Sequence, residues 1–571
     1  MKQEPNFRGR RIFVLSVFVF GLAVLLVRAV ELQLFDHEFL EEEGKARHLR
    51  VVEMPAHRGM ILDRNGQLLA VSTPVFSVWA NPAEALDSHG SVVRVAEILD
   101  LKVRDLAGKL EQKKNRQFLY IKRHIDPQQA ERLRQSDLSG FYLQREYRRY
   151  YPTAEVSSHV IGFTGIDDKG LEGIELAYED WLAGQPGAKK VIKDQLNRIV
   201  EDVEAIRIPR PGQNLTLSID RRVQYLAYRE LKAAYLQHGA LSASAVMVDT
   251  KTGEVLAMVN VPSFNPNNRK EHKQHTYRNR AVTDVFEPGS TMKPFVVALA
   301  LDSRRYSQET VIDTTPGTYK VGRFTIRDIR DFGPLSVNEV LLKSSNVGAV
   351  KMAFTIPRQD LWTTYDAIGV GQSTESGFPG EATGYLKNFQ DWHKTEHATM
   401  AYGYGMSMTA LQLARAYTVL ASDGKRATIS MLRREEEDSR SSTQSSVLSP
   451  QTVRQVRSIL DEVVSAEGTG SRAGVPGYTI AGKTGTVRKS AGNGYEKKYI
   501  AMFAGMAPAS DPRLVLVVLV NEPSKGAYYG GHVAAPVFSR IMGGALRLLN
   551  ITPDNVSLRA DTVRLPQDHA G

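Results

Sequence analysis

A single long apolar run near the amino terminus constrains the folding of this chain more than any other feature. Residues 12–27 carry no charge, and Arg28 interrupts the run before Ala29 and Val30 continue it. A helix of this length covers about 24 Å, against a hydrocarbon core of about 30 Å, and a snorkelling Arg28 lets the span continue to Leu34. We therefore expect one transmembrane anchor at 12–34, with the rest of the chain folding outside the bilayer.

The charges around this run indicate its orientation. Basic residues precede it and acidic residues follow it: Lys2, Arg8, Arg10 and Arg11, then Glu31, Asp36, Glu38, Glu41, Glu42 and Glu43. By the positive-inside rule, residues 1–11 form a cytoplasmic tail and the remainder is exported. A cleaved signal peptide is the alternative, because Val27-Arg28-Ala29 loosely fits a small-residue cleavage site. The length of the run favours a retained anchor.

Length and composition bound the exported part. A chain of 571 residues exceeds what one hydrophobic core usually organises, and 42% hydrophobic with 24% charged residues is typical of globular domains. The net charge of +10 is spread along the chain without a basic block, which argues against nucleic acid and suits anionic lipid or an acidic polymer. The absence of cysteine excludes thiolate catalysis, cysteine-ligated zinc and disulfides.

Pro209 and Pro211-Gly212 mark a boundary between two expected domains, 50–208 and 214–550, followed by a tail at 551–571. The first alternates short strands with charged helices. The second has the pattern of an α/β domain, with strands at both of its ends that must share one sheet. Its expected strands are 243–248, 254–259, 478–486, 499–506 and 514–520, with helices at 221–236 and 535–549. Residues 433–446 and 488–498 read as mobile surface loops.

Residues 287–294, Glu-Pro-Gly-Ser-Thr-Met-Lys-Pro, are the most informative stretch. Pro288 and Gly289 break the backbone before an apolar helical run, so Ser290 and Lys293 should share one face of the first turn. A serine needs a base to become nucleophilic, and a desolvated lysine with a lowered pKa can serve. The alternative is that Ser290 only caps the helix and Lys293 is solvated.

Two further motifs support the catalytic interpretation. Ser344-Ser345-Asn346 and, on an expected strand, Lys483-Thr484-Gly485 follow in that order. Together the three motifs resemble those of the serine penicillin-binding protein and β-lactamase superfamily. The resemblance implies catalytic Ser290, Lys293 and Ser344, a substrate site of Asn346, Lys483, Thr484, Gly485 and Thr486, and an oxyanion hole from the backbone N–H groups of Ser290 and Thr486.

The region before the catalytic domain narrows the family. Residues 58–66, 148–152, 162–165 and 170–175 resemble the boxes of class B penicillin-binding proteins, and the forms of 287–290, 344–348, 402–405 and 528–531 resemble the division-specific transpeptidases of Gram-negative bacteria. The resemblance implies an elongated α+β pedestal and a transpeptidase domain with a five-stranded antiparallel sheet flanked by helices. No glycosyltransferase domain fits before residue 215.

The same resemblance implies the activity and its setting. The expected enzyme is a septal peptidoglycan DD-transpeptidase of the inner membrane, periplasmic in its catalytic domain, which cross-links stem peptides at D-Ala-D-Ala and is inhibited by β-lactams. Expected partners are an FtsW-type glycan polymerase and other divisome proteins. No cofactor is implied and no metal is expected, because His57 and His159 lack metal-spaced partners.

Several alternatives stay open at this point. Tyr404, Tyr528, Tyr529 and His532 either line the substrate groove or pack beside Gly-rich turns. Water in place of an amine acceptor would make the protein a carboxypeptidase or β-lactamase. A β-lactam sensor is a non-enzymatic alternative, and a scaffold that recruits septal partners is a further one that does not exclude catalysis. The acceptor amine, diaminopimelate or lysine, and the oligomeric state do not follow from the residues.

Overall fold

The computed structural model describes residues 8–31, 33, 49–136, 138–193, 199–268, 273–434, 446–491 and 494–555. Among them, one helix is long and apolar enough to cross a membrane, α1 (Arg8–Val30), with a mean hydropathy of 2.6 over its most apolar window. It begins before the expected anchor because Arg8, Arg10 and Arg11 are good helix formers. Residues 1–7, part of the expected cytoplasmic tail, lie outside the described residues, as do 556–571 of the expected carboxy-terminal tail.

The chain divides into two compact units. The small unit comprises 1–57, 74–148 and 183–212, and the large unit comprises 58–73, 149–182 and 213–571. Two segments that the sequence led us to expect in the pedestal, 58–73 and 149–182, therefore group with the carboxy-terminal region. The strand β3 (Leu68–Ala80) runs from one unit into the other.

The small unit contains a three-stranded antiparallel sheet and a helical lobe. The sheet has the order β1-β8-β9. The lobe buries Val78, Val95, Leu99 and Leu106 in its own core. The elements are β1 (Leu49–Met54), β8 (Gly187–Lys193), β9 (Ile199–Arg207), α3 (Pro82–Asp87), α4 (His89–Ile98), α5 (Val103–Gln112), β4 (Leu119–Ile125), α6 (Pro127–Gln135) and β5 (Phe141–Tyr150).

The large unit is built on a five-stranded antiparallel sheet of order β12-β11-β19-β18-β17. This confirms the expected sheet and the joining of strands from both ends of the domain. The strands are β12 (Val255–Val261), β11 (Ser242–Asp249), β19 (Leu514–Asn521), β18 (Gly494–Ala507) and β17 (Ala481–Ala491). Because β17 lies at the end of this order, one of its edges has no partner strand in the sheet.

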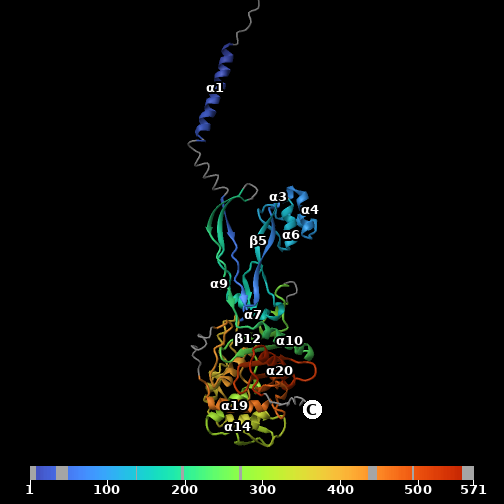
Figure 1. The fold of residues 1–571 in the computed structure, drawn as a ribbon, viewed down its shortest axis with the longest axis vertical. Helices are drawn as coiled ribbons and strands as arrows, with labels where there is room; N and C mark the ends of the chain where they lie inside the picture. Colours follow the sequence, from blue (N-terminus) through green and yellow to red (C-terminus); the bar gives the residue numbers. More distant parts are fainter. Residues whose placement is uncertain are drawn as a thin grey trace, which may run out of the picture. The chain divides into compact units, whose positions relative to one another are not determined.

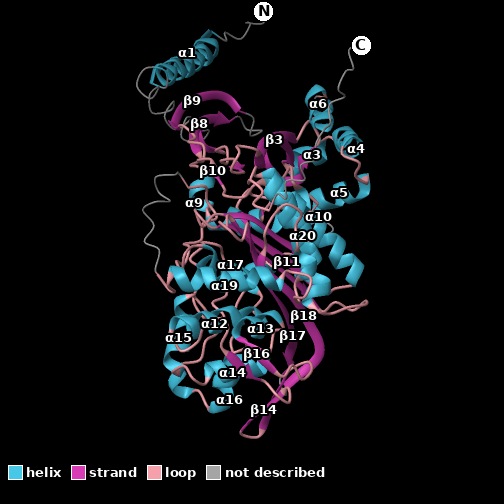
Figure 2. Ribbon diagram, turned by 60° about the horizontal axis from the view of Figure 1, so that its bottom comes forward, coloured by secondary structure: helices cyan, strands magenta, loops and turns pink. Residues whose placement is uncertain are grey.

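Helices cover both faces of this sheet (Figure 2). Alternate side chains of β19 enter different cores: Val515 and Val517 join one, and Leu516 and Val518 the other. Such two-sided burial explains the nearly unbroken apolar runs of the central strands. The helices α10 (Arg221–His238) and α20 (Gly530–Leu548) cover one face (Figure 1). The other face carries α11 (Arg280–Thr283), α12 (Lys293–Asp302), α17 (Ala410–Ala421) and α19 (Pro450–Val463).

Shorter elements complete the large unit. Beyond α12 lie β13 (Val311–Asp313), β14 (Thr318–Val321), β15 (Phe324–Arg327), β16 (Pro334–Ser336), α13 (Val337–Leu342), α14 (Asn346–Ala353), α15 (Arg358–Ala367) and α16 (Lys394–Met400). The segments before residue 217 contribute β2 (Ile61–Leu62), α7 (Ser158–Ile161), β6 (Phe163–Thr164), β7 (Gly170–Glu172), α8 (Gly173–Ala177), α9 (Glu179–Leu182) and β10 (Leu215–Thr216).

A buried ion cluster joins those segments within the large unit. Arg58 donates from Nε to Glu175 Oε2 at 2.8 Å, and Arg149 donates from Nε to Glu175 Oε1 at 2.6 Å. A second carboxylate, Glu179, lies 2.7 Å from Arg58 Nη1. Three of the four box regions, 58–66, 148–152 and 170–175, thus meet at one carboxylate.

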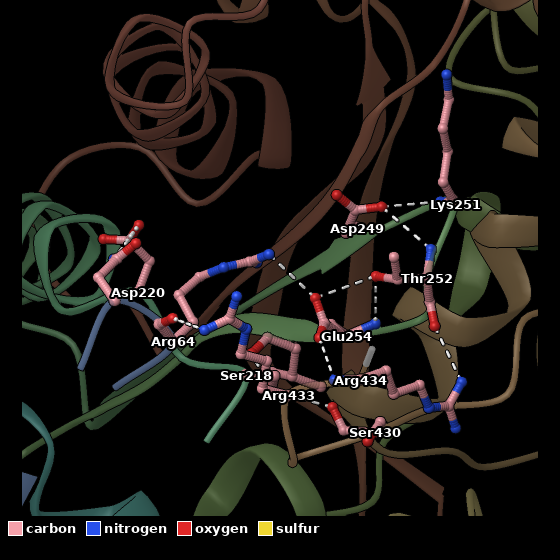
Figure 3. A network of polar contacts seen from close by, with 12 residues as sticks. Arg64, Ser218, Asp220, Asp249, Lys251, Thr252, Glu254, Ser430, Arg433 and Arg434 are labelled. Atoms are coloured by element: carbon pink, nitrogen blue, oxygen red, sulfur yellow. Dashed lines mark hydrogen bonds and ion pairs between the residues drawn. The ribbon is translucent and has the colours of Figure 1, made fainter. Parts of the chain in front are cut away.

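A second polar network ties Arg64 to the turn between β11 and β12 (Figure 3). The carboxylate of buried Glu254 lies 3.2 Å from Arg64 Nη2 and accepts the backbone N–H of Arg434 at 2.7 Å. Arg433 in turn donates to the carbonyl oxygen of Arg64 at 3.0 Å. The network holds 58–73 on the body of the large unit.

The two expected loops fared differently. Residues 435–445 lie outside the described residues, so most of the expected loop at 433–446 does too. The expectation of a loop at 488–498 is wrong, because β17 continues to Ala491 and β18 begins at Gly494. Glycine and charged residues suggested a loop, but hairpin strands that extend beyond a core need no apolar side chains.

Candidate functional site

The turn before α12 positions the candidate nucleophile. Gly289 has φ +56°, and a Cβ there would lie 2.4 Å from Val487 Cγ2, so both conformation and space require glycine. Its N–H donates to the carbonyl oxygen of Gly403 at 3.0 Å. Ser290 then lies in a 3-10 turn, η5 (Gly289–Met292), directly before α12. This places Ser290 and Lys293 one tight turn apart, as the sequence predicted.

Lys293 is fully buried and points at the second motif. Its Nζ donates to the carbonyl oxygen of Ser344 at 2.5 Å and lies 3.3 Å from Ser344 Oγ. Among the described residues, the Ser290 hydroxyl makes no hydrogen bond with Lys293 or with Lys483 of the third motif. Catalytic hydrogen bonds often tighten only when substrate is bound.

Ser344 lies between two lysines. Lys483, which follows Ser344 in the chain as Lys293 precedes it, has its Nζ 3.0 Å from Ser344 Oγ. Ser344 itself adopts φ +59°, a left-handed conformation that costs a non-glycine residue about 1 kcal/mol or more. The surrounding contacts hold this strained residue, and its hydroxyl therefore has a fixed place between the two amines.

The electrostatics of the two lysines follow from burial. Both side chains are 0% exposed, and neither has a carboxylate in ion-pair distance among the described residues. Burial lowers the pKa of Lys293 well below its ordinary value, and the charge of Lys483 lowers it further, while Asp328 opposes the shift. Burial lowers the pKa of Lys483 to about 7. Burial thus favours the neutral form of both amines, and for Lys483 that form is accessible near neutral pH.

Asp328 fixes the second motif, and sequence reasoning missed it. Its carboxylate accepts the hydroxyl of Ser345 and the N–H of Asn346, both at 2.5 Å, and the N–H of Val347 at 3.1 Å. It caps α14 at the amino terminus, where a negative charge is favourable. No spacing signal links it to the motif, because the connection arises only in the folded chain.

The side chain of Asn346 is oriented by the same segment. Its Nδ2 donates to the carbonyl oxygen of Arg327 at 2.9 Å, so the amide oxygen remains as an acceptor. The second motif therefore presents one hydroxyl, from Ser344, and one amide, from Asn346, on a backbone held by Asp328.

The third motif lies on β17, at the edge of the sheet. Thr484 Oγ1 donates to Thr469 Oγ1 at 3.1 Å, and Thr486 Oγ1 accepts the N–H of Gly530 at 2.9 Å. A Cβ at Gly485 would lie 2.5 Å from Met502 Cγ and 3.1 Å from Thr291 Cγ2. Glycine is therefore needed here to pack β17 against its neighbours, a reason that the sequence did not reveal.

Glu287 links the nucleophile turn to the residues around Tyr404. Its Oε1 accepts the N–H of Gly405 at 2.8 Å and the hydroxyl of Tyr495 at 3.2 Å. Tyr404 packs against both Tyr402 and Tyr495, with ring centroids 5.4 and 5.5 Å away. Desolvation raises the pKa of Glu287 and of Tyr404. Tyr404 is thus largely committed to packing beside the Gly403 turn.

The other expected groove residues belong to a partly exposed aromatic stack. Tyr528 stacks between Tyr499 and Tyr529, at centroid distances of 4.2 and 4.5 Å, and His532 meets Tyr529 edge-on at 6.4 Å. Tyr529 and His532 are exposed, directly before and within the first turn of α20. The stack flanks Gly530, which joins α20 to Thr486.

His57 and His159 have structural contacts. His57 meets Tyr147 edge-on at 5.2 Å. His159 is buried, its Nε2 lies 2.8 Å from the carbonyl oxygen of Thr276, and burial lowers its pKa to about 4. Among the described residues, no group of three or more His, Asp and Glu side chains could hold a metal ion.

The chain matches two family models. Residues 243–543 match the penicillin binding protein transpeptidase domain, and residues 53–217 match the penicillin-binding protein dimerisation domain. The first match contains all three motifs.

Known proteins resemble the chain over nearly its whole length. It is 42% identical to the peptidoglycan D,D-transpeptidase FtsI of Escherichia coli K12, over 97% of this chain and 94% of that one. It is 41% identical to the probable peptidoglycan D,D-transpeptidase PbpC of Pseudomonas aeruginosa, over 97% of both. The solved TP domain of Burkholderia pseudomallei penicillin-binding protein 3 covers 60% of this chain and 98% of its own length, with 44% identity and a TM-score of 0.55.

The matches and the fold lead to the same family assignment. The apolar helix α1 and the FtsI relatives together indicate a single-pass membrane protein. The two matched domains, the five-stranded sheet and the identity over 97% of the chain agree in one assignment. The chain belongs to the class B penicillin-binding proteins of the FtsI type.

Proposed function

We propose that the protein is a serine-type peptidoglycan D,D-transpeptidase. Ser290 Oγ attacks the carbonyl carbon between the two D-alanines of a stem peptide, the terminal D-alanine leaves with a proton, and an ester on Ser290 remains. An amine of a neighbouring stem peptide then attacks the ester and restores Ser290. The observation that carries the proposal is that two lysines contact Ser344 Oγ: Lys293, which follows Ser290 by one turn, and Lys483.

Lys293 and Ser344 have different roles in proton transfer. Lys293, which follows Ser290 by one turn, accepts the serine proton because its pKa is lowered by burial. Ser344 Oγ, 3.3 Å from Lys293 Nζ, passes the proton to the leaving amine. The same two groups deprotonate the acceptor amine in the second step, by microscopic reversibility.

Substrate binding falls to the second and third motifs. The amide oxygen of Asn346 accepts an N–H of the stem peptide, and the free edge of β17 pairs with the peptide backbone. Lys483 in its protonated form, with the hydroxyls of Thr484 and Thr486, binds the terminal carboxylate. The backbone N–H groups of Ser290 and Thr486 stabilise the developing oxyanion.

The positions of the carboxylates between the second and third motifs support aminolysis of the acyl-enzyme rather than its hydrolysis. Glu381 accepts from Thr374 and Ser376, and Glu396 pairs with Lys387 and accepts the N–H of His393. Among the described residues, Glu375, Glu462 and Glu467 make no hydrogen bond or ion pair with Ser290, Lys293 or Ser344, and none of these five glutamates belongs to a Glu-x-x-Leu-Asn motif. A base that activates water is therefore missing from the described site.

A transfer assay tests this proposal. The full-length chain is given a thioester analogue of acyl-D-Ala-D-Ala together with a D-amino acid at increasing concentration. Transfer product should exceed hydrolysis product and rise with the acceptor, and Ser290→Ala should abolish both. Hydrolysis that dominates at high acceptor concentration would make the protein a carboxypeptidase or β-lactamase.

The setting of the enzyme forms a second part of the proposal. We place the catalytic domain in the periplasm and the anchor in the inner membrane at the division septum, beside an FtsW-type glycan polymerase. Arg28 supports a helix partner, since a charge in an apolar span is costly, although its pairing with Glu31 at 2.6 Å reduces that cost. Exchanging residues 1–35 for an unrelated anchor should impair septal localisation and polymerase association; an unchanged result would make the helix a tether only.

A further inference from the structure

A basic hairpin projects beside the second motif. We define the basic arm as residues 318–330, which contain β14, β15 and the segment that follows. Figure 2 shows β14 at the end of the large unit, beyond α14 and α16. The strands pair antiparallel around Gly322, whose φ of +58° permits a tight turn.

The two faces of the arm differ in chemistry. Val321 and Ile326 are buried and hold the hairpin on the large unit. The register pairs Lys320 with Thr325 and Thr318 with Arg327, so these four side chains share the opposite face. That face combines two cations with two hydroxyls, which is a composition suited to carboxylates.

The positive charges of the arm lack acidic partners. Lys320, Arg323, Arg327 and Arg330 are all exposed, and none forms an ion pair with another described residue. Two of them lie over aromatic rings, Arg323 at 5.3 Å from Phe324 and Arg330 at 5.2 Å from Phe332. Stacking holds the guanidinium planes in defined positions while their N–H groups remain available.

The arm is connected rigidly to the candidate active site. Arg327 accepts Asn346 Nδ2 at its carbonyl oxygen, 2.9 Å away, and the next residue, Asp328, caps α14. The only carboxylate of the arm is therefore engaged in the cap and does not neutralise the exposed cations. Ile329, at 82% exposure, adds an apolar contact on the same segment.

We propose that the basic arm is a docking surface for the free carboxylates of stem peptides along a glycan strand. It would bind the polymer beside Ser290 and raise the local concentration of reacting peptides without touching the reacting atoms. This rests on the proposed function, because it assumes a polyanionic peptidoglycan substrate. Small substrates, which do not reach the arm, should gain nothing from it.

The test compares three variants of the full-length chain in detergent micelles. K320Q/R323Q/R330Q removes charge, R323K/R330K keeps it, and K251Q/R454Q/K525Q removes three exposed cations elsewhere on the large unit. Binding to soluble, uncross-linked glycan strands with pentapeptide stems is measured near 0.1 M salt. The glutamine variant of the arm should bind about tenfold more weakly, since three exposed charged contacts of about 0.5 kcal/mol each are lost. The lysine variant and the K251Q/R454Q/K525Q control should stay within about threefold of the unsubstituted chain.

The same strands with amidated stem carboxylates should bind the unsubstituted chain as weakly as the glutamine variant. Equal binding of acidic strands by the glutamine variant and the unsubstituted chain would overturn the proposal. A loss confined to anionic lipid vesicles without peptide would also overturn it and assign the arm to lipid. Penicillin acylation of Ser290 is measured in parallel and should be unchanged in all three variants. Its absence from the unsubstituted chain would contradict the proposed function, while strand binding would still decide the role of the arm.

Discussion

Two buried clusters of basic residues in the large unit differ in whether carboxylates balance their charge. At one, Arg58 and Arg149 meet Glu175 at 2.8 and 2.6 Å. At the other, Lys293 and Lys483 meet at the hydroxyl of Ser344. The first balances its cations with carboxylates, and among the described residues the second does not.

The difference follows from the residue types. Arginine keeps its proton at ordinary pH, so the charges of Arg58 and Arg149 persist in the interior and are balanced by a carboxylate. Lysine can become neutral, and burial without a partner therefore converts it into a base. Burial thus ties two guanidiniums to the carboxylate of Glu175, and at Ser344 it provides the base that the proposed mechanism needs. Exchanging these properties by mutation is the most direct way to examine the comparison.

The largest expected effect is on the lysine cluster. Lys293→Arg keeps the charge but cannot accept a proton, so penicillin acylation should fall by about 1000-fold, the scale of a lost general base. Lys293→Ala should fall similarly, and stopped-flow acylation measures both. Circular dichroism serves as the control for folding. Acylation within tenfold of normal in a folded Lys293→Arg protein would remove Lys293 from this role.

The carboxylate cluster should respond in stability instead. Glu175→Gln leaves two buried guanidiniums without their shared anion, which should cost about 3–5 kcal/mol of unfolding free energy. Glu179→Gln is the matched control: its side chain is 28% exposed, so its loss should cost about 1 kcal/mol. Denaturant unfolding measures both. Similar small losses of unfolding free energy for the two variants would show that burial of a carboxylate does not decide how much its ion pair stabilises the fold.

Asp328 offers an intermediate case, a carboxylate that acts on the lysine cluster through the backbone. Asp328→Asn weakens the cap of α14 and should cost about 1–2 kcal/mol, with acylation about tenfold slower because Ser344 and Asn346 lose their fixed place. Asp331→Asn, which alters an exposed turn carboxylate nearby, should leave acylation unchanged. If thermal stability falls for Asp328→Asn but acylation does not, Asp328 has no positioning role.

The smallest effect is a pH dependence from Lys483. Its pKa of about 7 means that the free protein loses this charge on the alkaline side, so the second-order acylation constant for an anionic penicillin should decline above pH 7. A penicillin ester without the carboxylate should lack this decline. Parallel profiles for both compounds would contradict carboxylate recognition by Lys483.

The same shift has a consequence for stability. Between pH 7 and the ordinary lysine value of 10.5, the unfolded chain binds a proton at Lys483 that the folded chain does not. The free energy of unfolding should therefore rise with pH across this window through Lys483, and Lys483→Met should remove that part of the rise.

The sequence predicted the parts of the molecule that depend on local pattern. Continuous apolar runs indicated the central strands such as β19, and Pro288-Gly289 indicated the turn before α12. Residues 488–498 were misjudged because a hairpin that leaves the core carries no apolar pattern. Asp328 and Glu175 could not be given partners from the sequence, since their contacts join segments far apart in the chain. The meeting of Lys293 with Lys483 followed only from family resemblance.

The most direct test of the account is intact mass spectrometry of the full-length chain after exposure to benzylpenicillin, with peptide mapping of the adduct. The account predicts one penicilloyl group on Ser290 that persists for many minutes, and no adduct on a folded Ser290→Ala protein. An adduct on another residue, or labelling that survives Ser290→Ala, would contradict the assignment of the nucleophile and with it the role given to the buried lysines.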